Sequence, residues 1–238
     1  QHGYTLGHFP QSFEHSTLGG WIATRSVGQQ SDGYGGIDEL LVCARVVTPA
    51  GVIRTLDVPR AASGPELNQL LLGSEGVLGV IVEATVRIRP TAARSDERGM
   101  LFRSFAGGVA AVREAARAEL PVAMMRLSDA DETELSLLLR HDPARRFDPT
   151  ATGLSLAERL GYGAGRCVLL YGAENSDAGK VATTMRRARN GFVRNGGLPL
   201  GRSPGRAWRR ERFRTPYLRD WLLDHGVAGI IFVSGKHA

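Results

Sequence analysis

The sequence predicts an α+β fold in two parts, and three observations lead to this fold class. Residues 1–94 combine many glycines with short strand-forming runs, whereas residues 95–238 alternate strand-like with helix-like segments. Apolar residues make up 42% of the chain and charged residues 23%, which is ordinary for a globular protein. With 238 residues, the chain is long enough to bury a core in one large domain or two small ones. We therefore expect a domain boundary after residue 94.

The first part contains a predicted β-hairpin. Leu41–Thr48 is a run of strand formers, Pro49–Gly51 has the composition of a turn, and Val52–Thr55 returns as the second strand. Pro65–Leu72 is typical of a short helix with proline in its first turn. Val80–Arg89 places apolar residues at its even positions and polar residues at its odd positions from 83 onward, which predicts a half-buried strand.

The second part is interpreted as strands and helices that follow one another around a sheet. Ser128–Asp131 resembles a capping box, Ser176 or Asp177 could cap a later helix, and Gly196 could end it. This order predicts a layer of helices against one sheet. We expect strands at 99–103, 122–127 and 166–172, and helices at 104–120, 128–139 and 176–195.

Two glycine-rich stretches carry the strongest functional signal. Ser16–Ser26 combines adjacent glycines with hydroxyl side chains and an arginine, and Leu72–Ile81 repeats glycine at every third position. Because glycine lacks a Cβ, a ligand could lie against the backbone, and hydroxyls, amides and a guanidinium together suit a pyrophosphate. Two walls of one cofactor groove are therefore expected. A hydroxyl-rich loop closing on itself and a glycine-rich turn entering a strand would give the same patterns.

Five segments occur in this order along the chain: Phe13–Ser26, Tyr34–Leu41, Val47–Gly51, Pro59–Pro65 and Gly73–Ile81. Together they resemble the FAD-binding domain of the vanillyl-alcohol-oxidase (PCMH-type) flavoproteins. The resemblance is dense over residues 3–90 and thinner through Arg126–Asp129 and Thr215–Asp220. Within this superfamily the chain is most similar to the alkyldihydroxyacetonephosphate synthase family and its bacterial FAD-linked oxidase relatives. The implied fold is the second half of a PCMH-type FAD-binding domain over 1–94, then a partial ferredoxin-like cap domain over 95–238 with helices on an antiparallel sheet.

The resemblance implies FAD as cofactor and assigns contacts to it. Gln11–Thr17 would line the flavin and diphosphate side, Thr24–Ser26 would hold the phosphates or ribityl chain, and Glu75–Ile81 would run beside the adenine half. Such sites use main-chain contacts more than charges. The implied cofactor-binding residues are Gln11, Ser12, Glu14, Ser16, Thr17, Gly19, Gly20, Thr24, Arg25, Ser26, Glu75, Gly76, Leu78, Gly79, Val80 and Ile81.

Arg219 is the implied catalytic residue. In the synthase family, the arginine of the matching Tyr-hydrophobic-Arg-Asp motif faces the flavin and engages the substrate, where a guanidinium can hold an anion and stabilise charge on the reduced ring. On the residues alone, an exposed helix arginine paired with Asp220 or Asp224 is the favoured interpretation. For Arg126 and Asp129, in the other shared motif, an ion pair of the cap domain is favoured.

The implied activity is an exchange of the acyl group of an acyl-dihydroxyacetone phosphate for a fatty alcohol at flavin N5, without net redox. The substrate is then a phosphorylated or acyl-bearing small molecule. The alternatives are an FAD-linked oxidoreductase of a hydroxy acid or alcohol, and an inactive truncated remnant. The expected location is cytoplasmic, with membrane association left open, and a homodimer is left open for the full-length protein.

The chain departs from the family pattern at both ends, so we expect a fragment. It lacks an upstream Pro-x-Gly-Gly-Gly-Thr-Ser-like loop and a downstream His-rich segment, and Ala228–Ala238 differs from the acidic, Trp-containing continuation of the family. A truncation or frame change near Gly226 would explain the ending; the encoding nucleotide sequence refutes it if no frame restores the family pattern. We expect this chain alone to bind FAD poorly and to be inactive.

The net charge of +6 comes almost wholly from arginine, since Lys180 and Lys236 are the lysines of the chain. Such a charge permits an anionic ligand, nucleic acid or a membrane surface. Arg186–Arg189 and Arg202–Arg214 are the densest basic segments, and aromatic residues in the second could stack on bases. Solvated helix faces are the favoured interpretation. We expect no nucleic-acid partner and leave peripheral membrane contact open.

The remaining chemistry-bearing residues point to no metal or membrane span. Cys43 and Cys167 lie in β-like apolar runs and are expected to be buried, reduced thiols, which weakly favours a reducing compartment. None of the six histidines has metal-ligand spacing to another. No apolar run approaches the roughly 20 residues that a membrane-spanning helix requires.

Overall fold

The computed structural model describes residues 2–59, 61–138 and 149–227. It divides into two compact units, each assembled from separate parts of the chain. The unit that we call the four-stranded unit comprises Gln1–Gly7, Gln29–Gly35 and Ile88–Ala207, and the three-stranded unit comprises His8–Gly28, Gly36–Arg87 and Trp208–Ala238. Residues 228–238, where the sequence departs from the family pattern, lie outside the described residues, as do Leu139 of a predicted helix and His141.

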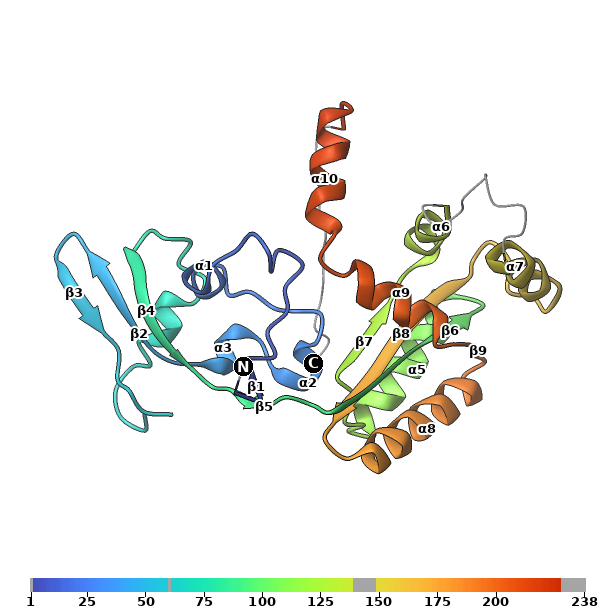
Figure 1. The fold of residues 1–238 in the computed structure, drawn as a ribbon, viewed down its shortest axis with the longest axis horizontal. Coiled ribbons are helices and arrows are strands. Elements are labelled where there is room, and N and C mark those ends of the chain that lie inside the picture. Colours follow the sequence, from blue (N-terminus) through green and yellow to red (C-terminus); the bar gives the residue numbers. More distant parts are fainter. Residues whose placement is uncertain (1, 60, 139–148, 228–238) are drawn as a thin grey trace. The chain divides into compact units, whose positions relative to one another are not determined.

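The four-stranded unit is built on an antiparallel sheet with the strand order β7-β8-β6-β9 among the described residues (Figure 1). Helices α5 and α8 cover one face of the sheet, and their mostly small apolar residues pack on the strands. The strands are β6 (Arg94–Phe102), β7 (Met124–Leu127), β8 (Cys167–Asn175) and β9 (Leu198–Gly201), and the two helices are α5 (Phe105–Arg117) and α8 (Ala178–Arg194).

Shorter elements complete this unit. Strand β1 (Tyr4–Thr5) pairs with β5 (Arg89–Pro90), and α2 (Ser31–Tyr34) lies against β7. Helices α6 (Ala130–Leu138) and α7 (Pro149–Arg159) follow β7 along the chain, and α9 (Ser203–Glu211) begins in this unit and ends in the other. The opposite face of the sheet packs Leu101, Val168 and Leu198 against Ala157 and Tyr162. Both faces of this sheet are therefore covered.

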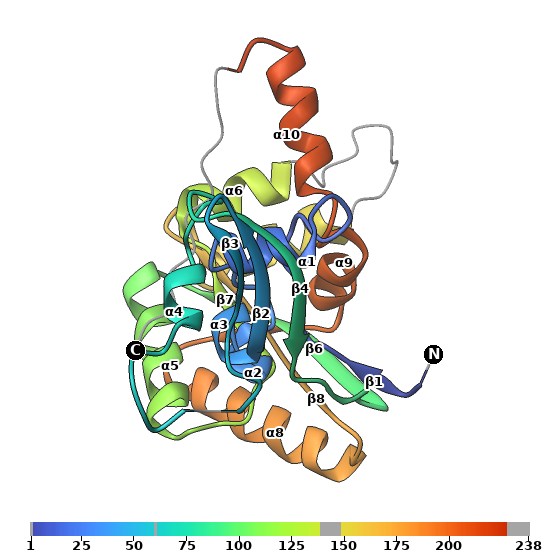
Figure 2. The same ribbon diagram turned by 90° about the vertical axis from the view of Figure 1, so that its left-hand side faces the viewer.

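The three-stranded unit contains the sheet β3-β2-β4 (Figure 2). Its core gathers residues from the first helix, the central strand and the segment before β4, with Ile22 and Ile37 fully buried. Its elements are α1 (Leu18–Ala23), α3 (Ile37–Leu40), β2 (Leu41–Thr48), β3 (Gly51–Arg54), α4 (Asn68–Leu71), β4 (Val80–Val86) and α10 (Thr215–Asp224).

These elements confirm the predicted α+β class with antiparallel sheets and helices. The hairpin of β2 and β3, strand β8 and helix α5, capped by Ser104, lie where the sequence predicts them. Helix α8 is capped by Asp177, whose Oδ1 accepts from the Gly179 and Lys180 amides at 2.7 and 3.3 Å. The predicted helix at 65–72 is shorter, as α4, and the predicted strand at 99–103 begins earlier, at the start of β6. Cys43 and Cys167 are buried free thiols, as expected.

Two local interpretations are wrong. The stretch Leu18–Ala23, which the alternative interpretation treats as part of a hydroxyl-rich loop, is a helix because the Thr17 hydroxyl caps it and apolar side chains repeat at helical spacing. In β4 the regular alternation fails at Val82, because Arg45 pairs with Glu83 whereas the next residue of β2 pairs with Ile81. This β-bulge shifts the core-facing side of the strand by one residue. The apolar Val80 and Val82 are therefore 67% and 49% exposed.

Candidate functional site

The two glycine-rich stretches meet in the three-stranded unit, as the groove prediction requires. The Gly73 amide donates to the Ile22 carbonyl at 3.2 Å, and the Glu75 amide donates to the Ala23 carbonyl at 2.9 Å. The stretches are thus joined by backbone hydrogen bonds at the end of α1. Arg25 and Glu75, at this junction, have φ angles of 49° and 51°, which are unusual for residues with a Cβ. Such strain is concentrated at functional sites.

The glycines of these stretches divide into packed and open positions. A Cβ at Gly19 would lie 3.1 Å from the Ile81 carbonyl oxygen, and one at Gly79 would lie 2.3 Å from the Val47 carbonyl oxygen. These two glycines allow α1 and β2 to approach the segment that leads into β4. A Cβ at Gly76, whose φ is +82°, would meet nothing within 4 Å. The open glycine turn at Gly76 is therefore the part whose backbone is free to approach a ligand.

The hydroxyl side chains of the first stretch hydrogen bond within it. Ser16 Oγ donates to the Ser12 carbonyl at 2.6 Å, and Thr17 Oγ1 accepts from the Gly20 amide at 3.1 Å. Thr24 Oγ1 donates to the Gly20 carbonyl at 2.9 Å. In this structure these hydroxyls hold the loop and helix together, as the closed-loop interpretation describes. A ligand would have to compete with these contacts for the same oxygen atoms.

Arg25 is also held by the protein. Its Nη2 donates to Gln69 Oε1 at 2.9 Å and to the Leu72 carbonyl at 3.4 Å, which connects the end of α1 to α4. The guanidinium therefore fixes the junction of the two stretches. A role on the FAD phosphates remains a prediction for this residue.

Sequence reasoning missed His8, which lies beside Ser26. The side chain is 1% exposed, its Nε2 lies 3.1 Å from Ser26 Oγ, and its ring packs edge-on against Trp21 at 5.0 Å. Its Nδ1 is buried with no hydrogen-bond partner in the described structure. Burial lowers the pKa of His8 from 6.5 to about 4, an effect that the charge of Asp38 opposes in part. A neutral imidazole follows at physiological pH; no sequence pattern around His8 indicated it.

The predicted flavin-side loop contacts the helix that carries Arg219. Tyr217 Oη donates to Glu14 Oε2 at 2.9 Å, and this bond raises the pKa of Tyr217. The Tyr217 ring also packs edge-on against His15 at 5.0 Å. The candidate catalytic residue thus lies two positions from a direct contact with the loop at 11–17. Within the described residues, the Arg219 guanidinium pairs with Asp220 at 2.6 Å and is about half exposed.

An aromatic cluster strengthens this contact between the loop and the end of the chain. The Arg212 guanidinium carbon lies 4.8 Å from the ring centre of Phe9, 5.4 Å from that of Trp208 and 4.7 Å from that of Phe213. Phe213 in turn stacks on Phe13 at 5.3 Å. Cation–π contacts and stacked rings each contribute modestly, and several together hold the two segments in place. Trp208 and Phe213, which the sequence offered as a stacking surface, are used within the protein.

The other shared motif lies in the four-stranded unit, where its charged groups contact the protein itself. Arg126 pairs with Glu132 of α6, and Asp129 Oδ1 accepts from the Glu132 amide at 2.8 Å as a helix cap. Arg126 thus forms an ion pair within this unit, but its partner is Glu132 and not Asp129. No group of His, Cys, Asp and Glu suited to a metal ion occurs in the described ranges. Over the same ranges, no helix combines the length and apolar character needed to cross a bilayer.

Residues 1–57 match the family described as FAD binding domain, and residues 98–232 match the family described as FAD linked oxidases, C-terminal domain. The second match covers more than half of the chain. The chain therefore belongs to the FAD-linked oxidase family, whose cofactor is FAD.

The alkyldihydroxyacetonephosphate synthase of Dictyostelium discoideum is 36% identical over 94% of this chain and 37% of its own length. A solved structure of an alkyldihydroxyacetonephosphate synthase matches with a TM-score of 0.79 at 35% identity, over 94% of this chain and 40% of that one. The FAD-linked oxidoreductase YgcU of Escherichia coli is 45% identical, but over 36% of this chain and 18% of its own length. The chain thus spans less than half the length of these relatives.

The glycine turn of the three-stranded unit fits FAD. No hydrogen bond to the backbone amides of Gly76 and Leu78 is found among the described residues, and the Leu78 side chain is 45% exposed. Free backbone amides in a turn are suitable donors to phosphate oxygens. Two main-chain donors of this turn, the amides of Gly76 and Leu78, therefore remain available, whereas the hydroxyls at 16–26 are already engaged. The remaining predicted contacts at Gln11, Ser12 and Glu14 lie in the loop beside α10.

Proposed function

We propose that this chain is part of an FAD-dependent enzyme that exchanges the acyl group of an acyl-dihydroxyacetone phosphate for a fatty alcohol. The synthase of Dictyostelium discoideum supports this proposal because it is similar along 94% of the chain, through both units. The FAD-linked oxidoreductase YgcU matches a little over a third of it. Substrate chemistry differs between such enzymes mainly outside the shared FAD-binding part, so the longer similarity carries more weight.

The hydrogen bond from Tyr217 to Glu14 is the main support for the roles that we propose for Arg219 and the loop at 11–17. It places the helix of Arg219 against the loop that the resemblance puts beside the flavin. Arg219 then serves as the anion-holding residue: a phosphate group of the substrate replaces Asp220 as the partner of its guanidinium. The bidentate fork orients the substrate for reaction. The cofactor residues are those predicted at 11–26 and 75–81.

FAD supplies, when bound, an electron-accepting ring at which the acyl and alkyl groups are exchanged. The residues of this chain have three tasks in that reaction. The amides of the turn at Gly76 hold phosphate oxygens, the loop at 11–17 borders the ring, and Arg219 holds the anionic end of the substrate and stabilises negative charge. The aromatic cluster around Arg212 holds the loop against the segment that leads into helix α10.

The second candidate is an FAD-linked oxidoreductase of a hydroxy acid or alcohol, which the similarity to YgcU over 36% of the chain favours. The two activities differ in a directly measurable way. A hydroxy acid would bleach the flavin absorption under anaerobic conditions, whereas the exchange leaves the flavin oxidised at the end of each turnover. Bleaching by D-lactate, without release of fatty acid from an acyl-dihydroxyacetone phosphate, would contradict the synthase proposal.

The first experiment measures FAD binding to this chain. We expect weak affinity, in the micromolar range or weaker, because the hydroxyls at 16–26 are engaged internally and few backbone amides remain as donors. The measurement is the quenching of flavin fluorescence and the absorption from about 350 to 500 nm after removal of free flavin. A flavin band that persists through gel filtration would show that the expected weak binding is wrong.

The second experiment tests Arg219 in the complete natural polypeptide that contains this chain. Arg219→Gln should reduce fatty-acid release from acyl-dihydroxyacetone phosphate by about a hundredfold, because a charge-assisted bidentate contact is lost. Arg187→Gln removes the same charge from α8 and should leave the rate unchanged. Equal rates for the Arg219 variant and the wild type would place the arginine outside the reaction.

Two further features of the enzyme are part of the same proposal. The lipid-like substrate makes peripheral contact with a membrane surface an expected property, in a cytoplasmic protein, and the full-length enzyme is proposed to be a homodimer. Flotation with vesicles and light scattering of the purified full-length protein test these two statements. Absence of any vesicle association would contradict the membrane contact, and a monomeric mass would contradict the homodimer.

A further inference from the structure

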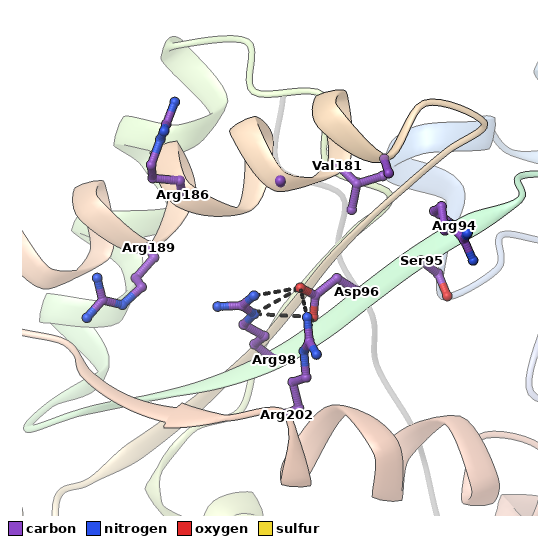
Figure 3. Close-up of a pocket in the computed structure, with 10 residues that line it drawn as sticks. Arg94, Ser95, Asp96, Arg98, Val181, Arg186, Arg189 and Arg202 are labelled. Carbon is purple, nitrogen blue, oxygen red and sulfur yellow. Dashed lines mark hydrogen bonds and ion pairs between the residues drawn. The ribbon is translucent and has the colours of Figure 1, made fainter.

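An arginine-lined pocket lies in the four-stranded unit, between β6, α8 and the residue that follows β9. Its volume is about 490 Å³, and five of the side chains that line it are arginines. Figure 3 shows Asp96 between Arg98 and Arg202, while α8 carries Arg186 and Arg189. The small residues Ala178 and Ala182, with Val181, leave the hollow open beside the strand.

The charge of this pocket is unbalanced. Asp96 is its single acid, and the arginines around it give a formal excess of four positive charges. Arg98 Nη2 donates to Asp96 Oδ2 at 2.6 Å, and Arg202 Nη2 donates to the same oxygen at 3.0 Å. Burial opposes the charged form of Asp96, but these hydrogen bonds outweigh it and lower its pKa, so the carboxylate stays ionised. Its acceptor capacity is nonetheless shared by two guanidinium groups.

The other three arginines of the pocket lack an acid. Neither a hydrogen bond nor an ion pair of the side chains of Arg94, Arg186 and Arg189 is found in the described part of the chain. The same helix shows the contrast, since Arg194 of α8 pairs with Glu114 at 2.7 Å. A solvated helix face would account for any one exposed arginine of α8 taken alone. It does not explain why arginines from three separate elements surround one hollow that contains a single, already occupied carboxylate.

We infer that this pocket binds a phosphate-bearing anion, at a site separate from the cofactor residues. A guanidinium presents paired N–H donors that match two phosphate oxygens, and a dianion would offset part of the excess charge. A volume of about 490 Å³ accommodates a small phosphorylated molecule or the headgroup of an acidic phospholipid. The inference rests on residues of the four-stranded unit alone and does not depend on the proposed reaction.

The test compares two sources of the same phosphate group with the intact chain. Glycerol 3-phosphate is titrated by calorimetry, and vesicles of phosphatidylcholine with or without phosphatidic acid are tested by co-sedimentation. Binding should weaken about tenfold for each pocket arginine removed, so the double variant Arg186→Gln, Arg189→Gln should lose about a hundredfold. Both side chains are exposed, so the fold should persist, and the melting temperature checks this.

The matched control is Arg187→Gln with Arg194→Gln, which removes two charges from the same helix outside the pocket. Binding of glycerol 3-phosphate that is lost in the pocket variant and kept in the control supports a soluble ligand. Binding confined to phosphatidic acid vesicles, with the same difference between variants, supports a lipid headgroup. Equal losses in both double variants, or no binding of either probe by the wild type, would overturn the inference.

Discussion

The four-stranded and three-stranded units both contain antiparallel sheets with apolar strands, but the faces of the two sheets are buried to different extents. In the four-stranded unit, the faces of the sheet pack on α5 and α8 on one side and on Ala157 and Tyr162 on the other. In the three-stranded unit, one side of the sheet packs on α1, while Val52 and Val80 remain 64% and 67% exposed. The comparison teaches that apolar strands alone do not make a closed core; a second layer is needed on each face.

The difference also separates the tasks of the two units. The well-packed unit carries the arginine pocket on a rigid framework of sheet and helices. The more open unit carries the glycine turn, the strained Arg25 and Glu75 and the buried His8, which are the features typical of a ligand-binding region. Regions that bind ligands are commonly drawn from the less stable parts of a protein.

The largest expected effect comes from opening the core of the four-stranded unit. Phe192 is fully buried and packs edge-on against Tyr171 at 4.9 Å, so Phe192→Ala should lower the free energy of unfolding of this unit by about 4 kcal/mol. Val52→Ala, at a mostly exposed position of β3, should change stability by less than about 0.5 kcal/mol. Urea unfolding followed by circular dichroism measures both, with the fluorescence of Tyr162 and Tyr171 reporting on the four-stranded unit and that of the tryptophans on the three-stranded unit. Similar losses for the two variants would contradict the comparison.

The next effect concerns pH and the three-stranded unit. His8 has its pKa lowered to about 4 in the folded state, from 6.5. Protonation therefore favours the unfolded chain, so the stability that the neutral imidazole provides is complete above pH 6.5 and is lost as the pH falls toward 4. The loss should reach about 3 kcal/mol.

The measurement is the urea midpoint of the wild type and of His8→Gln at several pH values within that window. Glutamine has no titrating group, so the variant should show a smaller decrease in stability on acidification, and the difference between the two profiles isolates the histidine. Parallel profiles would mean that His8 is protonated without cost and that it is hydrated in solution.

The smallest expected effect on stability comes from removing one helix cap in each unit. Thr17 caps the six-residue α1, and Ser104 caps the longer α5 through the Gly107 amide at 3.3 Å. Replacing either residue by alanine should cost about 1 kcal/mol. We expect the larger loss at Thr17, since a short helix depends more on its cap. Thermal unfolding of Thr17→Ala and Ser104→Ala tests this order, and a larger loss at Ser104 would reverse it.

Much of the four-stranded unit could be predicted from sequence because its signals are local. Ser104 and Asp177 begin helices with side-chain caps, Gly196 ends α8 with a positive φ, and Cys167 begins a strongly apolar strand. Periodicity, caps and turn residues suffice for such elements. These signals were also sufficient for the class of fold.

The candidate site was predicted less completely, because its contacts are long-range. The sequence indicated that the two glycine-rich stretches would come together, and the Gly73–Ile22 hydrogen bond joins them. Nothing in the local pattern showed that Gly79 serves close packing or that Tyr217 reaches Glu14, which lies far from it in the chain. Such pairings depend on tertiary structure that propensity does not encode.

The bulge in β4 means that this strand could lose one residue and still pair with β2. Because Arg45 pairs with Glu83 and Val46 with Ile81, residue 82 has no pairing partner on β2. A chain without it could keep both pairs and the same core face, in a regular strand. Homologous strands that differ by one residue at this point would therefore be structurally equivalent, and an alignment gap here need not signal a different fold.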